Sequence, residues 1–443
     1  MNYVPRIQEK TLRRFIEEKA QHKDVLLVEG ARQTGKTTLV EHVLSGVKRP
    51  TAAINFERRP ALLSKIDSCA DFSDFTAVLE DACGFDPSAN HVLFIDESQE
   101  SMKLGCFVRF MKEEWSNATV ILSGSTLTRL FRPSVRYPVG RVRRLTVTPF
   151  SFTEFLVALG NKREADAVQE EFRKTAPSRH LHLLELYDRY LTAGGLPRIA
   201  ADYADGKDYA GRTEEIVADY EQDFIRIFGE DTISIVKACF RSVAHFTGSA
   251  SKNTTVVPSP GTTVNNKINE IFARLEEWKL VLKSPQSGPS PEHSYGYLPK
   301  RYLFDTGLLR HFRETALPSL KLLGDARPEV RTVIGGIIEN QVAIDLSRGG
   351  AEISGWKKTP SGMEIDFIIR ENGETMPCEC KAALKIKGQH LRGLTDYMET
   401  YKVKRGVIVS GAPYCVIPVR KGKGEIVNVP LYAAEFLPRL AGA

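Results

Sequence analysis

The sequence has no long apolar run and no closely spaced cysteine pair of the kind that binds zinc. None of its hydrophobic segments approaches the ~18 residues that a membrane-spanning helix requires, and the N-terminal residues lack the apolar core of a secretion signal. Its seven cysteines are scattered and none forms Cys-x-x-Cys, which argues against a disulfide framework or a zinc site. We therefore expect a protein of the reducing cytoplasm with no membrane partner.

A strong charge imbalance is also missing. Lys and Arg number 61 and Asp and Glu number 55, which gives a net charge of +6. This charge permits an anionic partner without requiring one. Hydrophobic residues make up 42% and charged residues 26% of the 443 residues, as in soluble globular proteins. At ~100–200 residues per domain, this length predicts two to four domains.

Short apolar segments alternate with helical patterns in the first third of the chain. The continuous apolar segments are typical of strands that are buried on both faces of a sheet. Because the connections are short, the alternation predicts an α/β fold with a parallel, doubly wound sheet. Strands are expected at residues 25–28, 52–56, 92–95 and 119–122, and helices at residues 7–20, 36–44, 73–82 and 103–115.

The remainder of the chain shows two further patterns. Residues 155–245 are mostly helical, and a helix at 264–280 precedes strand-like segments at 280–283 and 295–304. Three helices followed by a two-stranded ribbon predict a winged helix. A separate α/β unit is expected after residue 328, with helices at 333–347 and 387–400 and strands at 364–369, 377–381 and 406–409.

The segment after the first predicted strand fits the pattern G-x-x-x-x-G-K-[ST] and precedes a predicted helix, which is the context this motif requires. Its backbone N–H groups would surround phosphate oxygens at the positive end of the helix. We expect Lys36 to reach the β- and γ-phosphates of ATP and Thr37 to bind Mg²⁺. The expected nucleotide-binding residues are Gly30, Ala31, Arg32, Gln33, Thr34, Gly35, Lys36, Thr37 and Thr38.

Two acidic residues, Asp96 and Glu97, follow the apolar strand at 92–95. The pattern predicts that Asp96 lies in the magnesium shell and that Glu97 polarises the attacking water. An adjacent Asp-Glu pair favours ATP hydrolysis over nucleotide storage. At the end of the next strand, Ser125 is the candidate for sensing the γ-phosphate, with Ser123 as the alternative.

An arginine-rich stretch follows, with six arginines and no acid between Thr126 and Leu145. Arg141, directly after Gly140, is the candidate arginine finger, acting on its own nucleotide or on that of a neighbouring subunit in a homo-oligomer. A nucleic-acid patch and a face paired with acids elsewhere are the alternatives. The six are Arg129, Arg132, Arg136, Arg141, Arg143 and Arg144.

Residues 25–155 resemble a group of prokaryotic AAA-type ATPases, in the segments 29–37, 55–57, 95–99, 124–125, 140–142 and 149–155. In that group a C-terminal region known as DUF4143 follows, and the segments 194–197, 303–308, 339–340 and 365–367 resemble it. The resemblance implies an ATPase, a winged helix and a nuclease-like domain in series. The predicted domains are an ATPase at 1–155, a helical lid at 156–212, a winged-helix-like domain at 213–325 and a restriction-endonuclease-like α/β domain at 326–443.

An acidic constellation in the C-terminal unit has the spacing of PD-(D/E)xK nucleases. Asp366 closes one strand, and Glu379 and Lys381 lie on one face of the next. Asp366 and Glu379 would share a divalent cation, Glu339 would be an additional ligand, and Lys381 would orient or deprotonate a water. Cross-strand ion pairing is the alternative, as is a nuclease fold without its chemistry.

Two functions follow from these patterns. The first is a Mg²⁺-dependent ATP hydrolase that acts as a switch or motor for a C-terminal domain that binds DNA and is a candidate for cutting it. The second is a nucleotide-gated scaffold with a silent nuclease-like domain that acts through protein partners. A nucleotide kinase is disfavoured, because no acceptor pocket is indicated and Glu97 points to water as the acceptor.

Overall fold

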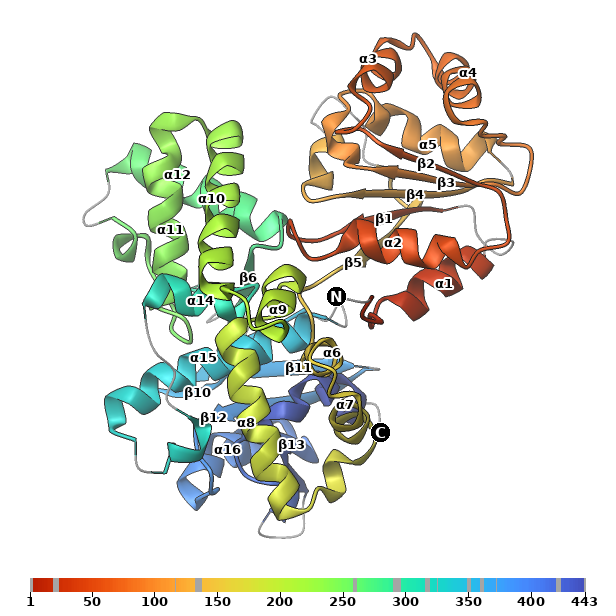
Figure 1. Ribbon diagram of the computed structural model, residues 1–443. Helices are drawn as coiled ribbons and strands as arrows, with labels where there is room; N and C mark the ends of the chain where they lie inside the picture. Colours follow the sequence, from red (N-terminus) through yellow and green to blue (C-terminus); the bar gives the residue numbers. More distant parts are fainter. Residues whose placement is uncertain are drawn as a thin grey trace. The chain divides into compact units, whose positions relative to one another are not determined.

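The chain folds into two compact units in the computed structural model shown in Figure 1. The first unit comprises Pro5–Thr148, and the second comprises Met1–Val4 with Pro149–Ala443. None of the helices among the described residues has the length and apolarity needed to span a membrane. The structure describes residues 3–18, 24–115, 117–131, 138–257, 261–289, 296–314, 319–324, 326–348, 352–358, 362–371, 373–419 and 424–441.

A five-stranded parallel sheet of order β2-β3-β4-β1-β5 is the centre of the first unit. The three inner strands are buried along their whole length, as parallel strands covered on both faces are. The strands are β1 (Val25–Glu29), β2 (Thr51–Asn55), β3 (Val92–Asp96), β4 (Thr119–Gly124) and β5 (Val142–Thr146). The predicted sheet is therefore confirmed, with β5 as a strand that the sequence analysis did not predict.

Alternating side chains of the sheet supply two separate cores. Leu26 and Val28 pack with α1 and α2 on one face, whereas Val25 and Leu27 pack with the core formed by α3, α4 and α5 on the other. This alternation follows from the two-residue repeat of a strand. The helices are α1 (Glu9–Glu17), α2 (Lys36–Ser45), α3 (Pro60–Ser68), α4 (Phe72–Cys83) and α5 (Leu104–Glu114).

The second unit begins with helices. The last three before the ribbon, α10 to α12, are followed by the antiparallel strands β6 and β8, which is the order predicted from the sequence. The expected helix at 264–280 ends earlier, because Lys279 has a left-handed φ of 61°. The elements are α6 (Phe152–Ala158), α7 (Lys162–Glu171), α8 (Pro177–Ala193), α9 (Pro197–Ala204), α10 (Tyr209–Phe228), α11 (Ile233–His245), α12 (Thr262–Glu277), β6 (Val281–Ser284), β8 (Lys300–Leu303) and α14 (Thr306–Arg313).

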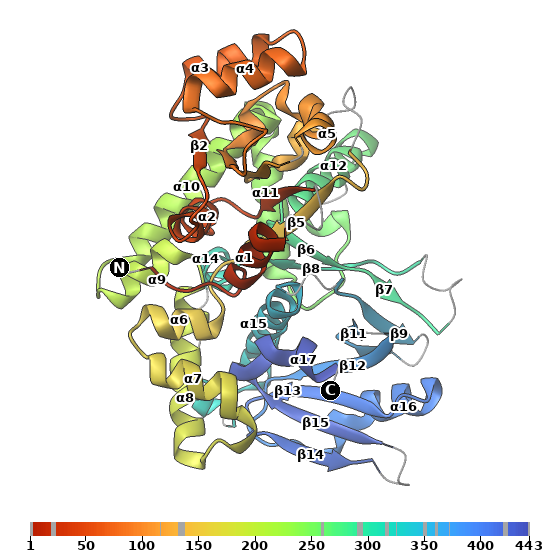
Figure 2. The ribbon, with the colours of Figure 1, turned by 90° about the vertical axis from the view of Figure 1, so that its right-hand side faces the viewer.

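The second unit ends in a mixed five-stranded sheet of order β11-β12-β13-β15-β14, on which α15, α16 and α17 pack (Figure 2). The strand predicted at 364–369 is in fact two strands, which belong to different sheets and meet at Asp366. The elements are α15 (Pro328–Ser347), β9 (Gly355–Lys358), β10 (Met363–Ile365), β11 (Phe367–Glu371), β12 (Glu374–Lys381), α16 (Arg392–Tyr401), β13 (Arg405–Ser410), β14 (Cys415–Pro418), β15 (Glu425–Pro430) and α17 (Leu437–Ala441), and β7 (Gln286–Ser287) pairs with β9.

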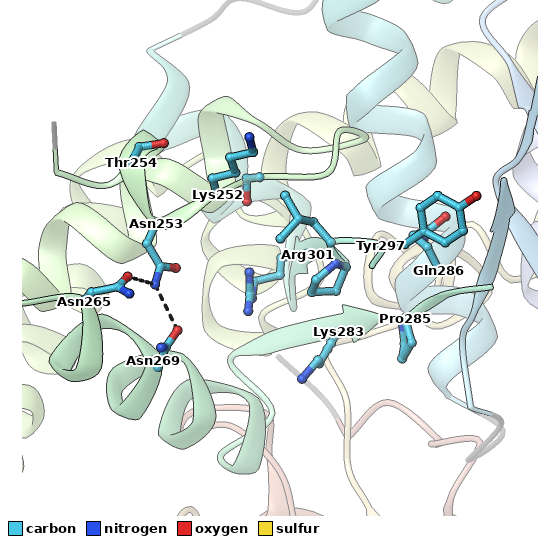
Figure 3. Close-up of a pocket in the computed structure, with 13 residues that line it drawn as sticks. Lys252, Asn253, Thr254, Asn265, Asn269, Lys283, Pro285, Gln286, Tyr297 and Arg301 are labelled. Atoms are coloured by element: carbon cyan, nitrogen blue, oxygen red, sulfur yellow. Dashed lines mark hydrogen bonds between the residues drawn. The ribbon is translucent and has the colours of Figure 1, made fainter. Parts of the chain in front are cut away.

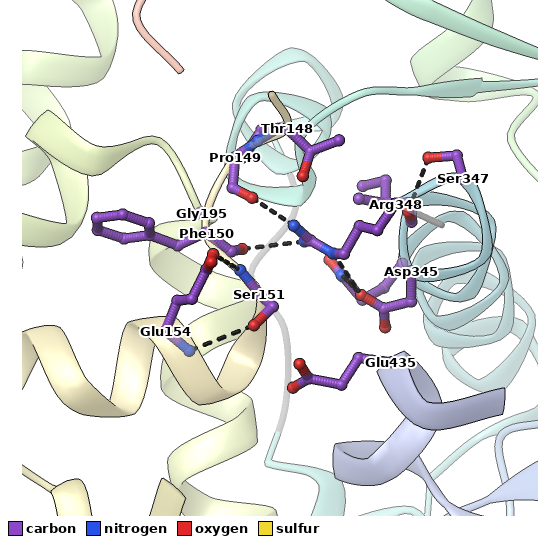
Figure 4. A network of polar contacts seen from close by, with 12 residues as sticks. Thr148, Pro149, Phe150, Ser151, Glu154, Gly195, Asp345, Ser347, Arg348 and Glu435 are labelled. Carbon is purple, nitrogen blue, oxygen red and sulfur yellow. Dashed lines mark hydrogen bonds and ion pairs between the residues drawn. The ribbon is translucent and has the colours of Figure 1, made fainter. Parts of the chain in front are cut away.

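A buried arginine ties the start of the second unit to its C-terminal sheet region (Figure 4). Arg348, at the end of α15, donates hydrogen bonds to the carbonyl oxygens of Pro149 and Phe150 and to the hydroxyl of Tyr190. It also pairs with Asp345 at 3.1 Å, and the two side chains are only 5% and 4% exposed. The guanidinium thus neutralises a buried carboxylate and supplies donors to two backbone carbonyl groups, one of which, that of Phe150, also accepts from the Tyr190 hydroxyl.

We expect Arg348→Met to lower the free energy of unfolding of the second unit by ~3–5 kcal/mol, because it leaves a buried carboxylate unpaired. Denaturant titration followed by circular dichroism would measure the change. Arg274→Met is the matched control: it removes a pair with Glu277 from a side chain that is 51% exposed, and the expected change is below ~1 kcal/mol. Equal effects of the two substitutions would contradict the structural role of Arg348.

Candidate functional site: a phosphate-binding loop and a buried acid cluster

The predicted phosphate-binding loop lies between β1 and α2, at the carboxyl edge of the first sheet. Its backbone needs left-handed conformations at Gln33, with a φ of 64°, and at Gly35, with a φ of 88°. Gly30 is required for a second reason, because a Cβ there would lie 2.2 Å from the carbonyl oxygen of Val147. Such a loop turns successive N–H groups toward one point, which forms an anion-binding concavity at the helix N-terminus.

The side chain of Lys36 lies inside this loop. Its Nζ donates hydrogen bonds to the carbonyl oxygens of Gly30 at 3.0 Å and Ala31 at 2.9 Å. Burial lowers the pKa of Lys36 to about 8, although the nearby Glu97 and Asp96 oppose this shift. Neutral carbonyl groups therefore hold the ammonium group. A phosphate oxygen carries negative charge and would accept a stronger hydrogen bond from it.

Asp96 connects the loop with the ends of the neighbouring strands. Its Oδ2 accepts hydrogen bonds from the Thr37 hydroxyl at 2.8 Å and from the amide of Asn55 at 2.9 Å, and its Oδ1 accepts one from Ser123. A threonine hydroxyl beside a carboxylate is a ligand set that suits Mg²⁺, so the residues fit the predicted ion. Ser123, the alternative to Ser125, is the serine in contact with Asp96.

Glu97 directly follows β3 in a left-handed conformation, with a φ of 51°. Burial raises the pKa of its carboxyl group, and its Oε2 accepts a hydrogen bond from the side chain of Gln99 at 2.6 Å. Neither Gln99 nor Asn55 was predicted to have a role at the site. The only signal for either was its place in the segments that resemble AAA-type ATPases.

Arg141 lies at the opposite edge of the first sheet. Its carbonyl oxygen accepts a hydrogen bond from the N–H of Val25, at the start of β1, whereas the phosphate-binding loop follows the end of that strand. Five residues of strand separate the two positions by ~16 Å. The guanidinium pairs with Glu113 at 2.9 Å. Arg141 therefore does not reach the loop of its own chain, and a role at a neighbouring subunit's nucleotide stays a prediction.

Two other arginines of the same stretch are paired with acids. Arg143 pairs with Asp24 at 2.8 Å, and Arg144 pairs with Glu29. For Arg143 and Arg144, these contacts agree with the alternative prediction that the arginine-rich stretch pairs with acids elsewhere in the chain. Arg132 and Arg136 lie outside the described residues.

The predicted acids of the C-terminal unit gather around a lysine that the sequence analysis did not identify. Lys300 of β8 places its Nζ 2.8 Å from Glu339 and 3.2 Å from Asp366, and 2.5 Å from a further acid, Glu364. Within the described part of the chain, no group of three or more His, Cys, Asp or Glu side chains is arranged to hold a metal ion. The three acids are arranged around an ammonium group instead.

Glu379 and Lys381 lie at the edge of this cluster and pair with each other. Burial, followed by the charge of Asp366, raises the pKa of Glu379. Burial and Asp366 also raise the pKa of Glu339, to about 7. The structure thus brings the three predicted acids and Lys381 into one region. Lys300 pairs with Glu339 and Asp366, and Lys381 pairs with Glu379.

A second candidate surface is a cavity of about 730 Å³ between α12 and the β6–β8 ribbon (Figure 3). One wall carries a hydrogen-bonded asparagine cluster in which Asn253 donates to Asn265 and Asn269. The cationic side chains that line the cavity are Lys252, Lys283 and Arg301.

The first unit has the parallel sheet, phosphate-binding loop and strand-end acids that define the P-loop ATPase class. Residues 22–156 match the family model described as an AAA domain. Residues 184–319 and 334–432 match two domains of unknown function, DUF8612 and DUF4143. The chain therefore carries an AAA-type P-loop ATPase domain, followed by a DUF8612 domain and a DUF4143 domain.

Two solved structures are similar to a large part of the chain. A Walker-type ATPase of Pyrococcus abyssi is 15% identical, with a TM-score of 0.45, over 70% of this chain and 96% of that chain. Cdc6p of Pyrobaculum aerophilum is also 15% identical, with a TM-score of 0.30, over 64% and 89% of the two chains. The comparison with curated proteins gave no match.

The lowered pKa of Lys36 predicts a pH-dependent affinity for ATP. Below pH 8 the ammonium form predominates, and above pH 8 the nucleotide must bind together with a proton. The dissociation constant should then rise by up to about tenfold per pH unit above pH 8. Calorimetric titrations between pH 7 and 9.5, in buffers of different ionisation enthalpy, would measure both effects.

Lys36→Arg is the control for this titration, since a guanidinium stays charged throughout that range. Its affinity, even if weaker, should not depend on pH. A wild-type affinity that is constant from pH 7 to 9.5, with no proton uptake, would contradict the assignment.

Proposed function

We propose that this protein hydrolyses ATP in the phosphate-binding loop with Mg²⁺ and uses the cycle as a molecular switch or motor. The observation that carries the proposal is the arrangement around Asp96. This one carboxylate links the loop residue Thr37 to the ends of three strands, and Glu97 lies directly beside it. A chance Gly-Lys-Thr segment would lack that surrounding set of polar groups.

Each residue has a defined part in this proposal. The N–H groups of residues 30–37 bind the phosphates, Lys36 moves from the loop carbonyls to the β- and γ-phosphate oxygens, and Thr37 and Asp96 hold the ion. A bound Mg²⁺ would supply positive charge that stabilises the phosphate oxygens. Glu97 accepts a hydrogen bond from the attacking water and takes its proton as the new O–P bond forms and the bond to the β-phosphate oxygen breaks.

Glu97→Gln should bind ATP with nearly unchanged affinity and hydrolyse it ~10²–10⁴-fold more slowly, because the amide does not take a proton from water. Phosphate release and fluorescent-nucleotide binding would separate the two quantities. Glu113→Gln is the control, since Glu113 lies with Arg141 at the far edge of the sheet. An unchanged hydrolysis rate in Glu97→Gln would overturn the role of Glu97.

We further propose that the second unit contacts DNA through the cavity between α12 and the ribbon and that it has the winged-helix arrangement. Basic side chains on α12 itself do not support base reading, because Lys267 and Arg274 pair with Glu270 and Glu277. The cavity combines cations with asparagine amides, which suit phosphate oxygens and sugar hydroxyls. Lys283 and Arg301 share the carboxylate of Glu276, so these two side chains keep one net positive charge beside that of Lys252. Contact with the DNA backbone is therefore favoured over a sequence-specific reading helix.

Replacing Lys252 and Lys283 together by Glu should weaken binding to all DNA sequences to a similar degree. The slope of log Kd against log salt concentration should fall by about two, one for each lost phosphate contact. Fluorescence anisotropy with a labelled duplex would measure it. Lys267→Glu, which lies on α12 and is not among the residues that line the cavity, should have little effect. Equal binding by the double variant and the wild type would exclude this surface.

The scaffold function, with a silent nuclease-like domain and protein partners, gains support from one observation. Lys300 pairs with Glu339 and Asp366, which are two of the three predicted metal ligands. We therefore propose that the switch acts on binding by the C-terminal region and not on strand cleavage.

A further inference from the structure

The ammonium group of Lys300 occupies the centre of the C-terminal acid cluster. Its side chain is 3% exposed, and three carboxylates from two regions of the chain surround it at 2.5 to 3.2 Å. Glu339 comes from α15, Glu364 from β10 and Asp366 from the junction between β10 and β11. The hydroxyl of Tyr302, which lies two residues beyond Lys300, also donates to Glu339 at 2.7 Å.

The acids that would bind a divalent cation are already engaged by other partners. Asp366 accepts the N–H of Cys380 at 2.9 Å on its second oxygen. Glu339 accepts from both Lys300 and Tyr302 on one oxygen. Glu379 pairs with Lys381, but its Oε2 is buried and has no hydrogen-bond partner among the described residues. Protein donors thus hold an oxygen of each of these three acids, whereas Oε2 of Glu379 has none.

We propose that Lys300 is the resident cation of this cluster and that it closes a latent divalent-cation site formed by Glu339, Asp366 and Glu379. Three buried carboxylates repel each other unless a positive charge lies between them. A divalent ion needs these oxygens at ~2.0–2.6 Å, so it and an ammonium group bound to the same oxygens exclude each other. The site opens only when β8 withdraws Lys300 from the acids.

The proposal concerns two domains of one unit. Lys300 and Tyr302 belong to the segment that matches DUF8612, whereas the three acids of the latent site belong to the segment that matches DUF4143. Whether the acids can bind a divalent ion therefore depends on the position of β8 against them. The same strand borders the cavity, because Arg301, the neighbour of Lys300, lines it.

Binding of Mn²⁺ to the nucleotide-free full chain tests this inference. Free Mn²⁺ would be followed by electron paramagnetic resonance in a background that carries Asp96→Asn, so that the phosphate-binding loop adds no site. In chains that keep Lys300, we expect the amount of bound Mn²⁺ to be the same with and without Asp366→Asn. Lys300→Met should gain one Mn²⁺ per chain, and addition of Asp366→Asn should remove it.

Lys283→Met is the matched control, because Lys283 lies on the paired strand β6 and is 47% exposed. It should gain no site. Mn²⁺ bound by the chain with Lys300 in place and lost on Asp366→Asn would overturn the proposal, as would a folded Lys300→Met that binds no Mn²⁺.

Loss of Lys300 also leaves buried carboxylates without a cation, so Lys300→Met is expected to melt at a lower temperature. Mn²⁺ should raise its melting temperature and leave that of Lys283→Met unchanged. If Lys300→Met does not fold in either condition, the titration of the chain with Lys300 in place decides: an Asp366-dependent site overturns the proposal, and its absence supports it. Since no nucleotide is present, failure here is distinct from failure of the proposed ATPase.

Discussion

The carboxylate of Asp96 is the interaction on which the nucleotide-binding edge depends. It accepts hydrogen bonds from Thr37, Asn55 and Ser123, which come from α2, β2 and β4. Parallel strands place their carboxyl ends at one edge, so residues far apart in sequence converge there without a long loop. The same geometry explains why Arg141, which precedes its strand, lies at the opposite edge.

Two buried lysines show how the same side chain serves opposite purposes. Lys36 is held by neutral carbonyl groups, and burial lowers its pKa to about 8. Burial also acts to lower the pKa of Lys300, but Asp366, Glu339 and Glu364 outweigh it and hold that pKa well above its ordinary value. The first lysine is available to an incoming anion. The second is already saturated with anions and holds its neighbours in place.

The sequence predicted the elements whose signals are local. The phosphate-binding loop, the acids at 96 and 97 and the first four apolar strands are each contained in a few consecutive residues. Strand β5 was missed because Arg143 and Arg144 give it no apolar pattern, although Leu145 packs into the core. Helix α15 was expected, but the arginine at its end gave no sign of the carbonyl groups it meets about 200 residues earlier in the chain.

Lys300 was missed for a related reason. A lysine on a short strand ordinarily indicates a solvent-exposed face, and its acidic partners lie 39, 64 and 66 positions later in the chain. Only the pairing of β6 with β8 and the approach of α15 reveal that this lysine is buried.

The domain boundaries predicted after residues 155, 212 and 325 stay predictions.

The charged character of β5 has a consequence for association. This strand is an outer strand of the first sheet, and Arg143 and Arg144 project charge from it beside Asp24 and Glu29. An outer strand is a template for addition of a foreign strand unless charged side chains make such addition costly. The arginines therefore oppose the addition of a foreign strand along β5.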